Sequence, residues 1–185
     1  MATAPKNGTV EHYLVSAAET TTSQLKDKAT PVVNQPYARI GLALMRLTIG
    51  IMFVWVFFEN WGKGLYTPTG YASLIHNYIE NGEAPAVWKS VMALAAAHAP
   101  MAAPLQAITE ISLGVLLVLG LCTRPAALVA FAFLTSLWVS EWGTAWIWEL
   151  LVPMMVSLAL VVGTAGRTWG VDAWLSRKRP SSLWW

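Results

Sequence analysis

The sequence predicts an all-α integral membrane protein, a four-helix bundle with a long outer segment between its first two transmembrane helices. Three observations support this class: hydrophobic residues make up 56% of the 185-residue chain, charged residues make up only 12%, and eleven residues are Trp. A soluble domain carries about 25% charged residues. Tryptophan favours the membrane–water boundary, where its ring is buried and its N–H stays hydrated. Lipid is therefore the expected solvent for much of the chain.

Four apolar stretches are each expected to form a transmembrane helix. They run over residues 37–58, 102–121, 125–140 and 145–162. A helix needs about 20 residues, each rising about 1.5 Å, to cross the hydrocarbon core. The third stretch is short and is expected to extend to Trp142. Pro153 interrupts the fourth, where neighbouring helices can satisfy the freed carbonyl group.

The segment between the first two stretches is expected to form two surface helices. Its apolar residues recur at the spacing of one helix face at Tyr71, Leu74, Ile75, Tyr78 and Ile79. A second helix is expected over residues 84–97. Both are expected to lie on the outer surface and cap the bundle.

The distribution of Lys and Arg predicts the orientation, because basic residues concentrate in cytoplasmic segments. They gather in the two tails and in the connection at Arg124. Both termini are therefore expected on the cytoplasmic side of a multi-pass protein with an even number of spans. The expected division is a polar tail (1–36), a membrane domain (37–176) and a basic, Trp-rich tail (177–185).

Two charged residues lie within the predicted spans. Arg46 interrupts the first and Glu110 the second. A charge inside the bilayer costs about 2.5–3.5 kcal/mol on insertion scales, so such groups usually face the bundle interior and pair. Counted from the cytoplasmic side, the two residues lie at similar depths, which predicts an Arg46–Glu110 ion pair. The pair can act as a structural clamp or take part in ligand binding or proton transfer.

A second polar group is predicted at the outer end of the spans. Glu59, Asn60 and Lys63 follow the first span in FFENWGKG, and Glu149 lies about four residues inside the fourth. Two tryptophans, Trp61 and Trp142, are expected at a similar depth. Such a group can hold a quinone head group or a small anion, with Glu or Lys donating protons near the aqueous boundary. The alternative is ordinary helix-end snorkelling within an aromatic belt.

Several other chemistries are not expected. The three histidines, His12, His76 and His98, lie outside the predicted spans, so two axial ligands for a membrane haem are not expected. The single Cys122 cannot hold an iron–sulfur cluster, which takes several thiolates. No metal site is expected. The absence of a basic stripe with interleaved aromatics argues against nucleic-acid binding.

Three ordered segments carry a family resemblance. They are RLTIGIMFVWVFFENWGKG, ITEISLGVLLVLGLCTRPAALVA and GTAGRTWGVDAWL. Together they resemble the DoxX family, and within it the DoxD-type membrane subunit of thiosulfate:quinone oxidoreductase, over residues 38–176. The resemblance implies a four-helix bundle in a bacterial or archaeal cytoplasmic membrane, a partner subunit and electron delivery to quinone. Polar positions of the family pattern fall at Arg46, Lys63, Glu110, Arg124 and Asp172.

Three functions stay open on the sequence. The first is an oxidoreductase membrane subunit that binds quinone and receives electrons from a sulfur compound or a partner. The second is a non-catalytic structural subunit packed beside a larger membrane complex. The third is a transporter or channel, although a chain without broken, inverted-repeat helices makes a poor transporter.

Overall fold

The computed structural model of the chain describes residues 12, 15–20, 36–163 and 165–178. The chain divides into two compact units, Met1–Ala38 and Arg39–Trp185. In the first unit, residues 15–20 are helical. Most of the two predicted tails lies outside the described residues, so their boundaries stay predictions.

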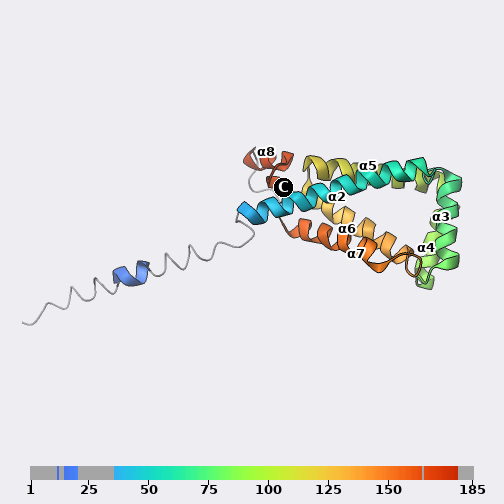
Figure 1. Ribbon diagram of the computed structural model, residues 1–185, viewed down its shortest axis with the longest axis horizontal. Helices are drawn as coiled ribbons and strands as arrows, with labels where there is room; N and C mark the ends of the chain where they lie inside the picture. The colour runs from blue at the N-terminus through green and yellow to red at the C-terminus, as the bar shows by residue number, and fades with distance from the viewer. Residues whose placement is uncertain (1–11, 13–14, 21–35, 164, 179–185) are drawn as a thin grey trace, which may run out of the picture. The chain divides into compact units, whose positions relative to one another are not determined.

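All regular structure in the described residues is helical, which confirms the all-α part of the predicted class. The elements of this part are α2 (Pro36–Gly62), α3 (Pro68–Asn81), α4 (Ala86–Ala97), α5 (Ala99–Leu119), α6 (Thr123–Ser140), α7 (Ile147–Val162), a short 3₁₀ turn (Ala165–Arg167) and α8 (Val171–Lys178). Figure 1 shows α3 and α4 together at one end of the long helices and α8 at the other. These ends are called the α3–α4 end and the α8 end.

Three of the four predicted spans are confirmed as helices long and apolar enough to cross a membrane: α2, α5 and α6. The predicted fourth span corresponds to α7, which is apolar but has 16 residues. This is shorter than the roughly 20 residues that a span usually needs.

The long helices share one hydrophobic core. Its buried residues come from α2, α5, α6, α7 and the 3₁₀ turn, with Leu117, Ala127 and Leu160 fully buried. α2 and α5 approach closely where Gly50 meets Gly114. A Cβ on Gly50 would lie 2.7 Å from the Val118 nitrogen, and one on Gly114 would lie 3.0 Å from the Val54 nitrogen. Small residues permit such close backbone contact between helices in a membrane.

The α3–α4 hairpin is built around a second hydrophobic cluster at the N-terminal end of α5. Thr67 caps α3 by accepting a hydrogen bond from the Gly70 N–H at 3.1 Å, as N-cap residues do. Lys89 of α4 donates to the carbonyl oxygens of Ile79 and Gly82, each at 2.7 Å, and so satisfies the C-terminal end of α3. The hairpin is therefore held together by polar as well as apolar contacts.

Two side-chain contacts attach this hairpin to the end of α6. The Trp88 indole N–H donates to the Ser140 hydroxyl at 2.9 Å, and the Tyr78 hydroxyl donates to the Glu141 carboxylate at 2.8 Å. The hairpin consequently spans from α5 to α6 and encloses a space between them.

Candidate functional site

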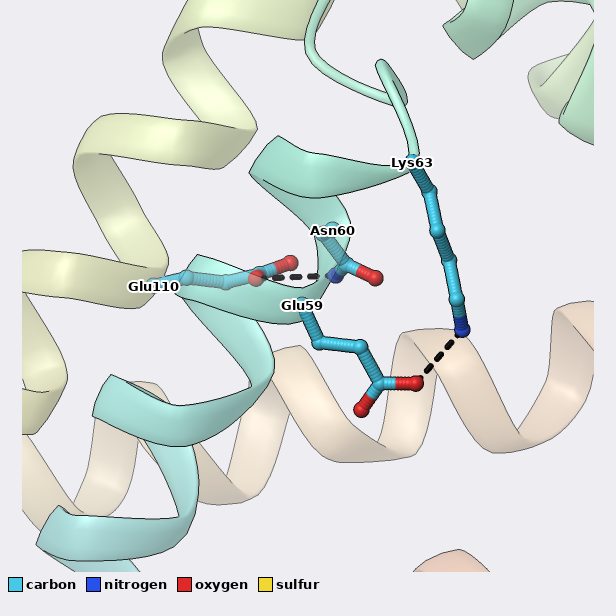
Figure 2. A network of polar contacts seen from close by, with 4 residues as sticks. All are labelled: Glu59, Asn60, Lys63 and Glu110. Carbon is cyan, nitrogen blue, oxygen red and sulfur yellow. Dashed lines mark hydrogen bonds and ion pairs between the residues drawn. The ribbon is translucent and has the colours of Figure 1, made fainter.

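A buried carboxylate lies midway along α5. Glu110 is only 1% exposed, and both of its oxygens accept hydrogen bonds from neutral side chains. Gln106 Nε2 donates to Oε1 at 2.9 Å, Asn60 Nδ2 donates to Oε2 at 3.2 Å, and the Tyr66 hydroxyl also donates to Oε2. These four residues are called the Glu110 cluster. Figure 2 shows Glu110 and Asn60 pointing toward one another from α5 and α2.

Each donor is held by its own local structure. Gln106 lies one turn before Glu110 on α5, and Asn60 lies in the last turn of α2. Tyr66 follows α2, and its ring stacks on Phe57 at 5.3 Å between centroids. Burial of the Tyr66 phenol, together with its hydrogen bond to Glu110, raises the Tyr66 pKa well above its ordinary value. Tyr66 therefore keeps its proton and stays a donor.

The predicted outer group is divided by the structure. Asn60 joins Glu110, whereas Glu59 and Lys63 form an exposed ion pair at 2.6 Å on another side of α2 (Figure 2). Their side chains are 49% and 58% exposed. An exposed pair of this kind contributes about 0–1 kcal/mol. Trp61 is also exposed.

The other two residues of that predicted group, Trp142 and Glu149, are exposed and lie elsewhere. Trp142 lines a pocket of about 200 Å³ beside Glu141. Burial, and to a lesser extent Glu149, raises the pKa of the Glu141 carboxyl group, against the lowering effect of the Tyr78 hydrogen bond. The residues of the predicted single outer pocket therefore lie in three places: with Glu110, in the exposed Glu59–Lys63 pair, and around Trp142.

The predicted Arg46–Glu110 ion pair is wrong. Both side chains are buried, but Arg46 Nη2 donates to the Trp169 carbonyl at 3.1 Å, at the α8 end. Asn60, which contacts Glu110, is fourteen residues further along α2, or about 21 Å at the usual helical rise. The prediction assumed that the cytoplasmic ends of the two helices lie at the same height in the bundle. It failed because α2 begins about ten residues below the height at which α5 ends.

Arg46 instead belongs to a second buried polar group. Asp172 Oδ1 and Oδ2 accept hydrogen bonds from the Cys122 and Thr123 N–H groups, each at 2.8 Å, at the N-terminus of α6. The Asp172 N–H donates to the Gly120 carbonyl at 2.9 Å. Arg46, Asp172 and these main-chain partners are called the Asp172 cluster.

Glycines make room for the Arg46 guanidinium. Gly120 has a φ of 64°, and a Cβ there would overlap Arg46 Nη1. A Cβ on Gly170 would lie 2.9 Å from the same nitrogen. Among the residues that the structure describes, Arg46 Nε and Nη1 have no hydrogen-bond partner, and protein atoms enclose both. The Asp172 cluster is thus packed tightly around its charges.

A cavity of about 370 Å³ lies beside the Glu110 cluster. α3, α4, α5 and α6 form its walls, which are mainly apolar. Its polar lining residues are Tyr71, Tyr78, Gln106, Thr109, Ser136 and Ser140. Gln106 belongs to both the cavity and the Glu110 cluster, so one side chain connects the buried carboxylate with the cavity.

The sequence analysis missed three residues of these groups. Tyr66, Gln106 and Glu141 were not singled out, although Gln106 and Glu110 stand four residues apart on one helix, the spacing of neighbouring side chains. That spacing was a usable signal for Gln106. In the part of the chain that the structure describes, no three His, Cys, Asp or Glu side chains are placed to hold a metal ion.

The comparisons with known proteins agree with the membrane class. A family model described as DoxX matches residues 41–143, which is more than half of the chain. Searches of curated proteins and of solved structures found no match. The matched residues contain α5, α6 and all but the first five residues of α2, the three helices that are long and apolar enough to cross a membrane. The chain is a multi-pass membrane protein and belongs to the DoxX family.

Proposed function

We propose that this chain is the membrane subunit of a quinone-linked oxidoreductase. In this proposal the cavity receives the quinone head group, and the Glu110 cluster delivers a proton to it. The observation that carries the proposal is the Gln106 side chain, which lines the cavity and donates a hydrogen bond to the buried Glu110 carboxylate. Ionisable residues within membrane helices are expensive, and they commonly serve proton transfer or ligand binding.

The cavity suits a flat, mostly apolar ring with polar carbonyl groups. Small-molecule pockets usually measure roughly 300–1,000 Å³ and combine an apolar lining with a few polar groups. Gln106 has two amide N–H groups and uses one for Glu110. The second can donate to a quinone carbonyl, because Gln106 also lines the cavity.

The two oxygens of Glu110 support a route for protons. Oε1 is bound by Gln106, which lines the cavity, and Oε2 is bound by Tyr66, a half-buried residue outside the long helices. Reduction of a quinone to a quinol takes two electrons and two protons. For each of these protons, Glu110 would first be protonated from the aqueous side past Tyr66 and would then pass the proton to the cavity through water.

The electrons come from outside this chain in our proposal. Their source is a reduced sulfur compound, oxidised by a partner subunit, as the resemblance to the DoxD-type membrane subunit implies. A protein subunit is a better donor than a free small anion, because the cavity is mainly apolar and lies beside a carboxylate. The location follows from the same resemblance: a bacterial or archaeal cytoplasmic membrane.

A fourth crossing by α7 would place both termini on the cytoplasmic side. α7 starts just after α6 ends, and the Gly163 carbonyl at its far end accepts a hydrogen bond from Arg124 Nε, at the start of α6, at 3.4 Å. α7 therefore runs back along the length of α6. If α7 crosses the membrane, reporter fusions at residues 145 and 185 should report opposite sides, and the same side for both would contradict this topology.

The proton-transfer role is tested by infrared difference spectroscopy on the purified protein in nanodiscs with added ubiquinone. Electrochemical reduction of the quinone should change a carboxyl absorption band of wild-type protein. The band should disappear in Glu110→Gln and persist in the matched control Glu59→Gln, which alters only the exposed pair. A band that persists in Glu110→Gln would contradict the proton-transfer role of Glu110. A band lost only in Glu59→Gln would assign that role to the exposed Glu59–Lys63 pair instead.

A non-catalytic structural role is the second candidate, favoured by one observation. α2 exposes large apolar side chains along one side, including Ile51, Trp55 and Phe58. Trp55 is 72% exposed, and such a surface suits another membrane protein. A photo-crosslinker at position 55 should then capture the same protein subunit whether or not Glu110 is intact. Capture of lipid alone would count against this role.

A further inference from the structure

A second hollow continues the cavity along the same two helices. It has a volume of about 410 Å³ and lies between α5 and α6, toward the α8 end. Its lining is apolar apart from a few small side chains such as Thr109 and Ser112. Thr109 lines both hollows, so the two meet at this residue.

The residue spacing shows that the two hollows share one surface of each helix. Lining residues recur every three or four positions along both helices, as expected for a single helix face. On α5 they include Ala102, Gln106, Thr109, Ser112 and Leu116, and on α6 they include Ala126, Val129, Phe133, Ser136 and Ser140. We call the second hollow, which lies toward the α8 end, the α5–α6 groove.

The α5–α6 groove is open to the outside of the protein. Ile108 and Val129, which line it, are 61% and 50% exposed. Within a membrane this outside is hydrocarbon. From Ile108 to Leu116 the α5 wall of the groove extends about 12 Å at the usual helical rise. The groove is lined mainly by apolar side chains, whereas the cavity carries more of the polar groups.

We propose that the α5–α6 groove binds the isoprenoid tail of a long-chain quinone whose ring occupies the cavity. The inference rests on the proposed function and adds the substrate class to it: a long-tailed, lipid-soluble quinone rather than a short one or a small anion. The polar cavity and the apolar groove match the two parts of that molecule in order along one helix face. Burying the tail against protein adds apolar contact that a tail-less ring cannot make.

The test fills the groove from its exposed side. Val129→Trp places a large ring in the groove, and Leu128→Trp is the matched control, because Leu128 is equally exposed on α6 but does not line the groove. Each protein is reconstituted in nanodiscs and titrated with two probes at equal mole fraction in the membrane. One probe is ubiquinone with its full tail, and the other is a tail-less analogue. Quenching of tryptophan fluorescence reports binding, and Trp88 lines the cavity.

We expect wild-type protein to bind the long-tailed quinone more tightly than the tail-less one. Val129→Trp should weaken binding of the long-tailed quinone by roughly tenfold and leave the tail-less analogue unchanged. Leu128→Trp should change neither. Thermal unfolding of both variants shows whether they fold as the wild type does.

The other outcomes each decide the question. Unchanged long-tail binding in Val129→Trp would overturn the groove while leaving the cavity as a quinone site. An equal loss for both probes, or for both variants, would also overturn it, since the effect would then not belong to the tail. If neither quinone binds wild-type protein, the proposed function fails, and the groove assignment fails with it.

Discussion

The two ends of the helical core bury charge in opposite ways. At the α8 end, the Asp172 carboxylate accepts hydrogen bonds from main-chain N–H groups, and glycines fit closely around Arg46. Toward the α3–α4 end, Glu110 accepts hydrogen bonds from three side chains, one of which lines a cavity. Both carboxylates are at most 1% exposed.

The difference shows that burial alone does not identify a functional charge. Main-chain donors are fixed by the fold, so removing the carboxylate that they bind leaves them buried without a partner. Side-chain donors can rotate or exchange partners as a proton moves. The Asp172 cluster is therefore expected to control stability, and the Glu110 cluster to control activity at smaller cost in stability.

The largest expected effect is from Asp172→Ala. The change leaves the Cys122 and Thr123 N–H groups without their acceptor and Arg46 without its neighbouring carboxylate. We expect the free energy of unfolding to fall by about 3–5 kcal/mol. Heating in detergent while a thiol reagent labels Cys122, the single cysteine, measures this. Arg177→Ala, on the exposed side of α8, is the control and should change little; equal labelling curves would contradict the role of Asp172.

The next largest effect on stability compares Gly120, which makes room for Arg46, with Gly41, which has no close neighbour. Gly120→Ala places a Cβ against the Arg46 guanidinium at a left-handed backbone position. We expect a loss of about 1–3 kcal/mol in the free energy of unfolding. Gly41→Ala on α2 has open space around its new Cβ and should stabilise by up to about 1 kcal/mol. Equal melting temperatures for the two variants would show that the packing at the α8 end is not tight.

A smaller effect on stability, with a larger one on activity, is expected at the other end. Tyr66→Phe keeps the stacking on Phe57 and removes the hydroxyl that donates to Glu110. We expect a loss of about 1 kcal/mol in stability and a roughly tenfold slower formation of quinol by the purified complex. Trp61→Phe, on the exposed side of α2, serves as control. Unchanged quinol formation in Tyr66→Phe would remove this residue from the proton route.

The sequence predicted the helices better than the contacts between them. Hydropathy and spacing located α2, α3, α5 and α6 closely, because each helix is determined mainly by its own residues. The Arg46–Glu110 pairing failed because it required the relative heights of two helices, which depend on the Gly50–Gly114 contact. Glu110 itself was identified, since a charge within a span is conspicuous in a sequence.

The remaining site residues depend on tertiary structure. Tyr66 meets Glu110 only because the chain turns after α2 and stacks Tyr66 on Phe57. Glu141 is partly buried because the α3–α4 hairpin brings Tyr78 to it. No local sequence pattern predicts the Tyr66–Glu110 contact or the Tyr78–Glu141 contact. The exposed Glu59–Lys63 pair has such a pattern, a spacing of four residues, but its interaction is weak.

The smallest predicted effect concerns the pH dependence of stability at Glu141. Burial raises the pKa of this carboxyl group above its ordinary value, so folding favours its protonated form. Its contribution to stability is complete below the ordinary Glu pKa of about 4.3 and is lost as the pH rises through the higher pKa of the folded state. The melting temperature of the wild type should therefore fall slightly as the pH rises across that range.

The Glu141→Gln variant tests this, because its side chain can still accept a hydrogen bond from Tyr78 but cannot ionise. Its melting temperature should not show this fall, and the variant should be slightly more stable than the wild type near neutral pH. The exposed Glu80→Gln variant should follow the wild-type curve, and parallel curves for all three proteins would show that Glu141 ionises as freely in the folded chain as in the unfolded one.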